Sequence, residues 1–192
     1  MNIIIVSGSI RENASTKKVA LNLFNHFQRH HNVVTEVVDL KEYDYPIWKQ
    51  VFDKEENPPA KCIHLHKKLK NSDAMVFITP EYNGGYSLAL KNMIDYFGLK
   101  VFEKKTIGVT AVSTGGMGGI RAGLQLQQLI LAIYAIPVPQ MLLVPNIQQR
   151  FDNDGVLLDA SFEKNVSTFT NEFIWLAEAV YEKHRAVGVS SE

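Results

Sequence analysis

Residues 3–17 read Ile-Ile-Ile-Val-Ser-Gly-Ser-Ile-Arg-Glu-Asn-Ala-Ser-Thr-Lys. The run from Ile3 to Val6 is short and wholly apolar, which predicts a buried strand. Apolar residues then recur at helical spacing from Val19 to Phe27, which predicts a helix. The polar residues in between therefore form a loop that leads from a strand into the N-terminal end of a helix.

Such a loop favours an anion, because backbone N–H groups and the positive end of the helix dipole point into it. It also carries hydroxyl groups and two cations, which suit a terminal phosphate. The candidate phosphate ligands are Ser9, Arg11, Ser15, Thr16 and Lys17. The alternative is that Asn13 or Ser15 simply caps the helix and that Arg11 is a solvated charge.

The composition is that of a globular protein, with 192 residues, 46% of them apolar and 21% charged. We expect one domain over residues 1–187 and a disordered tail over residues 188–192. Twenty cations balance twenty anions, which argues against a nucleic-acid partner and weakly against a strongly acidic electron carrier. Cys62 is the only cysteine, which excludes an intramolecular disulfide. With no basic leader and no long apolar run, we expect a cytoplasmic protein without a membrane partner.

Strand and helix patterns alternate along the whole chain. Further apolar runs predict strands at 33–38, 74–79, 106–112 and 138–144, and helical periodicity predicts helices at 60–70, 88–97, 120–134 and 160–184. This alternation predicts an α/β fold with a parallel sheet covered on both faces. We expect a flavodoxin-like three-layer sandwich whose five strands have the order 2-1-3-4-5.

In that order the loops after the first, third and fourth strands meet at one edge of the sheet. The second of these loops contains Asn83-Gly84-Gly85, and the third contains Gly115, Gly116 and Gly118, so both backbones can approach a flat ligand closely. A phosphate at one end and a planar polar ring at the other describe a mononucleotide, and FMN is typical of this topology.

Two side chains of these loops are candidates for contact with the ring plane. Tyr82 either touches the ring or packs on its neighbours, and Met117 either touches the ring or fills a gap against the following helix. Glu81 either forms an ion pair, with Arg121 as one candidate, or is solvated.

The sequence contains no nucleophile with a base beside it, so we expect no catalytic side chain; a redox cofactor carries out the hydride chemistry itself. We also expect no metal site, because His64 and His66 face different sides of a helix. His26 is expected at the surface. Residues 41–59 have no clear period and form a partner surface, a site rim or an irregular surface loop.

The chain resembles the NAD(P)H-dependent FMN reductase family, flavodoxin-like proteins that include quinone, azo-dye and chromate reductases. The motifs are Gly8-Ser9-Ile10-Arg11 with Ser15, then Pro80-Glu81-Tyr82-Asn83 followed by Leu90-Lys91-Asn92-Met93-Ile94-Asp95-Tyr96, and Gly115-Gly116-Met117-Gly118-Gly119 with Arg121-Ala122. The resemblance extends from Asn2 to about Ala179. Two features depart from it: Ser15 comes one residue later than is usual after Arg11, and Ser87-Leu88 stands where many members have Pro-Gly.

The resemblance implies bound FMN, with NADPH or NADH as the electron donor and a ping-pong cycle to a quinone, azo, flavin or metal-oxyanion acceptor. It implies a phosphate site at Ser9, Arg11, Ser15, Thr16 and Lys17. It implies a ring site at Pro80, Glu81, Tyr82, Asn83, Gly84, Ser113, Thr114, Gly115, Gly116, Met117 and Gly118. It further implies a homodimer or homotetramer through the helix Leu88–Phe97, whose broad apolar face agrees with this.

Two other functions remain open at this point. One is a flavodoxin-type electron-transfer protein without a substrate of its own. The other is a protein that keeps the fold but binds a different phosphorylated ligand, or none.

Overall fold

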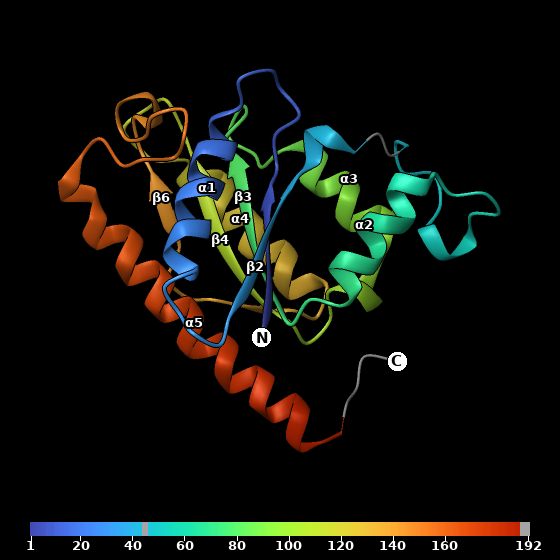
Figure 1. Ribbon diagram of the computed structural model, residues 1–192. Coiled ribbons are helices and arrows are strands. Elements are labelled where there is room, and N and C mark those ends of the chain that lie inside the picture. Colours follow the sequence, from blue (N-terminus) through green and yellow to red (C-terminus); the bar gives the residue numbers. More distant parts are fainter. Residues whose placement is uncertain (44–45, 189–192) are drawn as a thin grey trace.

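The computed structural model describes residues 1–43 and 46–188, and Figure 1 shows a sheet packed between two layers of helices. Of the predicted tail at 188–192, residues 189–192 lie outside the described residues. The strands and α-helices are β1 (Asn2–Ser7), α1 (Ser15–Phe27), β2 (Val34–Asp39), α2 (Ala60–Lys70), β3 (Ala74–Pro80), α3 (Leu88–Phe97), β4 (Thr106–Val112), α4 (Ile120–Ala132), β5 (Ile136–Pro137), β6 (Leu142–Val144) and α5 (Glu163–Ala186).

The strands are parallel and lie in the order β2-β1-β3-β4-β5, with β6 also paired to β4. The predicted fold class and strand order are confirmed. Because the carboxyl ends of parallel strands share one edge, the loops after β1, β3 and β4 emerge side by side.

The fifth position of the sheet differs from the predicted continuous strand at 138–144. It consists of β5, which pairs with the start of β4, and β6, which pairs with its end. The N–H groups of Ile136 and Val138 donate to the carbonyl oxygens of Lys105 and Ile107 at 2.9 and 3.0 Å. Pro137 and Pro139 alternate with them, so their nitrogen atoms face the open edge of the sheet, where a strand tolerates proline. The pairing with β4 then stops and resumes at Leu142.

Side chains that alternate along the strands pack into two separate hydrophobic cores, one on each face of the sheet. On β1, Ile4 and Val6 face the core beneath α2, α3 and α4, whereas Ile3 and Ile5 face the core beneath α1 and α5. Figure 1 shows α1 and α5 on one side of the sheet and α2 and α3 on the other. All seven residues of β3 and of β4 are buried, as expected for central strands covered on both faces.

The apolar face of α3 is covered mostly by the chain itself. Leu90, Met93, Ile94, Tyr96 and Phe97 are buried, and Leu88 is 72% exposed. Their outer cover comes from the long segment after β2. There the ring of Phe52 lies 5.6 Å from that of Phe97 and 5.9 Å from that of Tyr96. The breadth of this face therefore does not by itself require a second subunit.

Polar contacts hold the same segment against α3. The side chain of Asn92 donates to the carbonyl oxygen of Pro46 at 2.9 Å and accepts from the N–H of Trp48 at 2.7 Å. Part of the segment after β2 thus packs against α3. Within residues 1–43 and 46–188, no helix is both long and apolar enough to cross a membrane.

Candidate functional site

The first loop of the site, residues 8–14, runs from β1 to α1. Gly8 has no room for a side chain, because an added Cβ atom would lie 2.5 Å from the carbonyl oxygen of Ile78. Its N–H donates to that same oxygen at 2.8 Å. Ser9 follows as a buried residue, and its hydroxyl shares a 3.0 Å hydrogen bond with the hydroxyl of Tyr82. The loop is therefore anchored to β3 before it reaches α1.

Helix α1 begins without a side-chain cap. Its N-cap residue is Ala14, no side chain in the described part of the chain accepts from its first N–H groups, and its first turn has no acidic residue. The alternative that Asn13 or Ser15 caps the helix is therefore wrong; Asn13 instead takes a left-handed conformation with φ of 53°. Because the first N–H groups of a helix have no partner within it, this end favours an anion.

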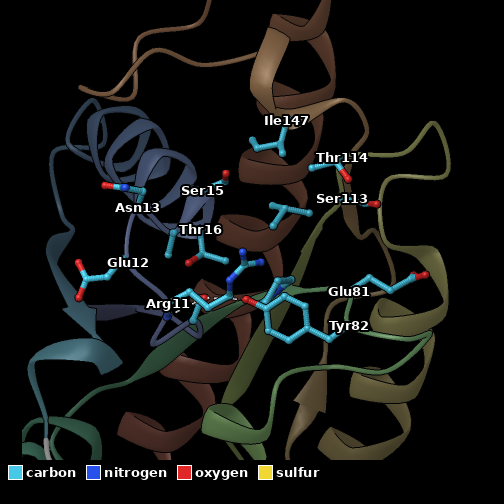
Figure 2. Close-up of a pocket in the computed structure, with 14 residues that line it drawn as sticks. Arg11, Glu12, Asn13, Ser15, Thr16, Glu81, Tyr82, Ser113, Thr114 and Ile147 are labelled. Atoms are coloured by element: carbon cyan, nitrogen blue, oxygen red, sulfur yellow. Dashed lines mark hydrogen bonds between the residues drawn. The ribbon is translucent and has the colours of Figure 1, made fainter.

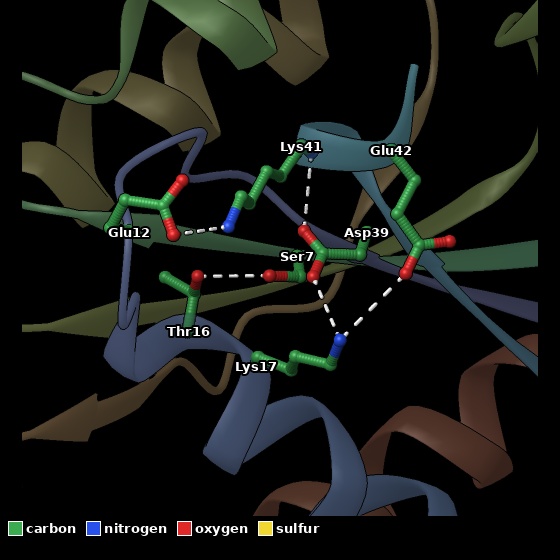
Figure 3. A network of polar contacts seen from close by, with 7 residues as sticks. All are labelled: Ser7, Glu12, Thr16, Lys17, Asp39, Lys41 and Glu42. Carbon is green, nitrogen blue, oxygen red and sulfur yellow. Dashed lines mark hydrogen bonds and ion pairs between the residues drawn. The ribbon is translucent and has the colours of Figure 1, made fainter.

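Two sets of ion pairs lie beside the first loop (Figure 3). The amine of Lys41 lies 2.6 Å from the carboxylate of Glu12, which offsets the negative charge of that residue. The amine of Lys17 lies 3.4 Å from Asp39 and 3.7 Å from Glu42. Lys17 thus reaches toward the end of β2, although the sequence places it with the phosphate ligands.

The second loop turns back sharply at Asn83-Gly84. Tyr82 and Gly85 exchange two backbone hydrogen bonds of 3.0 Å, and the φ angles of Asn83 and Gly84 are 51° and 82°. Two successive positive φ angles define a type I′ turn, which Asn-Gly favours. The turn directly follows Tyr82 in the chain. The guanidinium carbon of Arg11 lies 5.7 Å from the centroid of the Tyr82 ring.

The third loop leaves β4 beside the end of β6. The N–H of Ser113 donates to the carbonyl oxygen of Val144 at 3.1 Å, and the Ser113 hydroxyl accepts from the N–H of Gly115 at 3.1 Å. Residues 114–117 form an exposed tip. Met117 is 70% exposed, so it does not fill a gap against α4.

The three loops enclose one cleft of about 280 Å³ (Figure 2). Figure 2 shows Arg11 and Tyr82 meeting at its floor, with Ser113 and Thr114 on the opposite wall from Asn13 and Ser15. The cleft is lined by Ser9, Arg11, Glu12, Asn13, Ala14, Ser15, Thr16, Pro80, Glu81, Tyr82, Val112, Ser113, Thr114 and Ile147. Segments far apart in the sequence therefore form a single site.

Most of the predicted site residues lie together, but seven do not line this cleft: Lys17, Asn83, Gly84, Gly115, Gly116, Met117 and Gly118. Asn83 and Gly84 instead shape the turn under Tyr82. Gly116, Met117 and Gly118 line a neighbouring hollow beside Arg150. Sequence reasoning missed five lining residues: Glu12, Asn13, Ala14, Val112 and Ile147. The first three lie in the predicted phosphate loop, whereas no pattern in the residues around Ile147 indicates a site.

The lining residues fit a phosphate monoester. Ser9, Ser15 and Thr16 offer hydroxyl groups, Arg11 offers a planar cation, and no ion pair joins Arg11 to an acid among the described residues. Within that part of the chain, no cluster of His, Cys, Asp or Glu side chains has a metal-binding arrangement. The site is therefore chemically suited to a phosphorylated organic ligand.

Comparison with known families identifies this ligand class. The family model described as NADPH-dependent FMN reductase matches residues 1–149. The chain belongs to this family. Membership confirms the predictions of an enzyme, of FMN as its cofactor and of NADPH as an electron donor.

Two curated relatives have names that match this family. An NADPH azoreductase from Bacillus sp. (strain OY1-2) is 27% identical over 147 residues, which is 77% of this chain and 78% of the relative. A quinone reductase from Pseudomonas putida is 28% identical over 164 residues, which is 82% of this chain and 85% of the relative.

The fold also matches solved structures. FerB, a flavoenzyme NAD(P)H:(acceptor) oxidoreductase from Paracoccus denitrificans, aligns with a TM-score of 0.76 over 93% of this chain and 97% of its own, at 23% identity. An archaeal flavodoxin aligns with a TM-score of 0.59 at 14% identity. At these identities the likeness supports the flavodoxin-like fold alone.

Proposed function

We propose that this FMN reductase family member passes electrons from NAD(P)H to a small quinone, azo, flavin or metal-oxyanion acceptor by a ping-pong mechanism. Bound FMN would supply the hydride-accepting and hydride-donating chemistry. The observation that carries the proposal is the meeting of three loops at one cleft, beside a helix N-terminus that none of the described side chains caps. The names of the curated relatives support the choice of acceptors.

We assign the phosphate of FMN to the uncapped end of α1. Ser9, Arg11, Ser15 and Thr16 would bind it there, and each charge-assisted hydrogen bond contributes roughly 1.5–3 kcal/mol when shielded from water. The Lys41–Glu12 pair would keep a carboxylate from repelling the phosphate. Lys17 would act only indirectly, because its amine pairs with Asp39 and Glu42.

We assign the ring of FMN to the second and third loops. The proposed contacts inside the cleft are Pro80, Glu81, Tyr82, Ser113 and Thr114. The cleft volume of about 280 Å³ lies slightly below the range of ligand pockets, which span about 300–1,000 Å³. We therefore propose that the ring extends from the enclosed part toward Asn83, Gly84 and residues 115–118, where its outer face stays open to donor and acceptor.

A ping-pong cycle follows from the sharing of one open face by both substrates. The donor must leave before the acceptor can approach the same surface. We further propose that residues 1–187 act as a single FMN-binding domain in the cytoplasm, where NADPH is supplied. For a homodimer or homotetramer the exposed Leu88 of α3 is the available apolar contact on the predicted interface helix.

The test is steady-state oxidation of NADPH by the purified protein with a quinone as acceptor. We expect a yellow protein, turnover above that of the same concentration of free FMN, and parallel double-reciprocal plots at several acceptor concentrations. Converging plots would contradict the ping-pong mechanism. A colourless protein that takes up no added FMN would contradict the whole proposal.

A further inference from the structure

Glu81 connects the second loop to the start of α4. Its Oε2 atom accepts hydrogen bonds from the backbone N–H groups of Arg121 at 3.2 Å and Ala122 at 3.4 Å. Its Oε1 atom lies 3.8 Å from the guanidinium of Arg121. Figure 2 shows the carboxylate of Glu81 turned away from Arg11. The acid therefore faces α4 and not the proposed phosphate site.

Helix α4 has no cap of its own. Its N-cap residue is Gly119, which has no side chain, and its first turn has no acidic residue. Gly119 cannot readily be replaced by a capping residue, because its φ is +79° and an added Cβ atom would lie 3.1 Å from that of Ala111. A carboxylate near the first N–H groups of a helix satisfies them and interacts favourably with the helix dipole.

Glu81 is well placed to hold this geometry. Its side chain is only 15% exposed, and its own N–H donates to the carbonyl oxygen of Val112 at 3.0 Å. The backbone of Glu81 is thus tied to the end of β4, and its carboxylate is tied to the start of α4. The third loop, residues 113–119, lies between these two attachment points.

We propose that Glu81 is a positioning residue that caps α4 from the neighbouring loop and so fixes the second and third loops relative to each other. The proposal rests on the proposed flavin site, because these two loops are the ones assigned to the ring. It separates the roles of two motifs: the first loop recognises the phosphate, whereas the carboxylate of Glu81 sets the width of the ring site by holding α4, even where other atoms of Glu81 border the ring.

The first test compares FMN with riboflavin, which lacks the phosphate. The affinity of the apoprotein for each flavin is measured by the quenching of flavin fluorescence. We expect Glu81→Ala to lower the affinities for FMN and riboflavin by a similar factor of about 10, which corresponds to 1.4 kcal/mol. Glu81→Gln keeps an acceptor oxygen for the two N–H groups and should restore most of the affinity. A loss confined to FMN would overturn the proposal, because it would place Glu81 in phosphate binding.

Arg121→Ala is the matched control. It removes the exposed ion pair, which contributes little in water, but it leaves both backbone N–H groups in place. We expect both flavin affinities to stay within about twofold of the wild type. If Arg121→Ala lowered flavin affinity as much as Glu81→Ala does, the result would overturn the capping role in favour of the ion pair.

A second measurement needs no flavin at all. Amide hydrogen exchange of the apoprotein should become faster at Arg121 and Ala122 in Glu81→Ala, and unchanged exchange there would overturn the proposal. If the wild-type protein bound neither flavin, the proposed function would fail, whereas the exchange result would still decide whether Glu81 caps α4. Should Glu81→Ala fail to fold, Glu81→Asp provides the same comparison, because its side chain is one methylene shorter and withdraws the carboxylate from the two N–H groups of Arg121 and Ala122.

Discussion

Arg11 and Lys17 have the same charge and flank the same helix start, but they contact different groups. The guanidinium of Arg11 lies over the ring of Tyr82 in the cleft, whereas the amine of Lys17 lies between Asp39 and Glu42. The difference arises because Arg11 belongs to the loop, while Lys17 lies in the first turn of α1 and extends toward β2. From residue type alone, both were predicted to be cations that bind the phosphate. Only the folded structure shows that their side chains contact different groups.

At this scale we predict that the Arg11→Ala, Ser15→Ala double variant loses FMN. Removing two phosphate contacts should cost about 3 kcal/mol or more, which is an affinity loss of about 100-fold or more. Riboflavin affinity should change little, and the far-ultraviolet circular dichroism should be that of the wild type. Lys17→Ala should lower FMN affinity by less than about threefold, since its amine pairs with Asp39 and Glu42 and not with the proposed phosphate site. Undiminished FMN affinity in the double variant would contradict the phosphate assignment.

At the scale of elements, Ser87 sets where α3 begins. Its hydroxyl accepts from the N–H of Leu90 at 3.2 Å, which makes Ser87 the N-cap of the helix. The same hydroxyl donates to the carbonyl oxygen of Gly8, and its own N–H donates to the hydroxyl of Thr79 at 3.0 Å. A residue that departs from the family pattern therefore joins α3 to both β3 and the first loop.

We predict that Ser87→Ala lowers the free energy of unfolding by about 2 kcal/mol. Loss of the cap contributes about 1 kcal/mol, and the buried carbonyl of Gly8 loses its hydroxyl donor. Urea unfolding should show a lower midpoint with an unchanged slope. Thr168→Ala on the exposed side of α5 should differ from the wild type by less than about 0.5 kcal/mol. Equal midpoints for Ser87→Ala and Thr168→Ala would contradict this role.

For the whole molecule, the sequence predicted the layers and the strand order, because long apolar runs alternate with amphipathic ones. It also predicted which three loops meet, since topology alone places them at one edge. The side-chain partners could not be predicted. The ion pairs of Lys17 depend on how α1 lies against β2, and the contact of Ile147 depends on the path of the chain after β6. His26 was expected at the surface but is buried where α1 packs on α5.

This burial predicts a pH dependence of stability. Burial lowers the pKa of His26, although Glu163 lies 3.6 Å away and partly opposes the shift, and burial also lowers the pKa of His66. Both side chains are therefore neutral in the folded protein at pH values where the unfolded chain, with a histidine pKa of about 6.5, already binds protons. The free energy of unfolding should fall as the pH drops from about 7.5 to about 6, as measured by urea unfolding. A flat profile over this interval would contradict the prediction.

The interrupted edge formed by β5 and β6 has a consequence for self-association. A regular edge strand offers a row of N–H and C=O groups onto which another chain can add a strand, and this is a common route to aggregation. Here Pro137 and Pro139 remove two donors from that row, and neither short piece is long enough to template a partner. Copies of this protein should therefore resist strand addition along this border of the sheet.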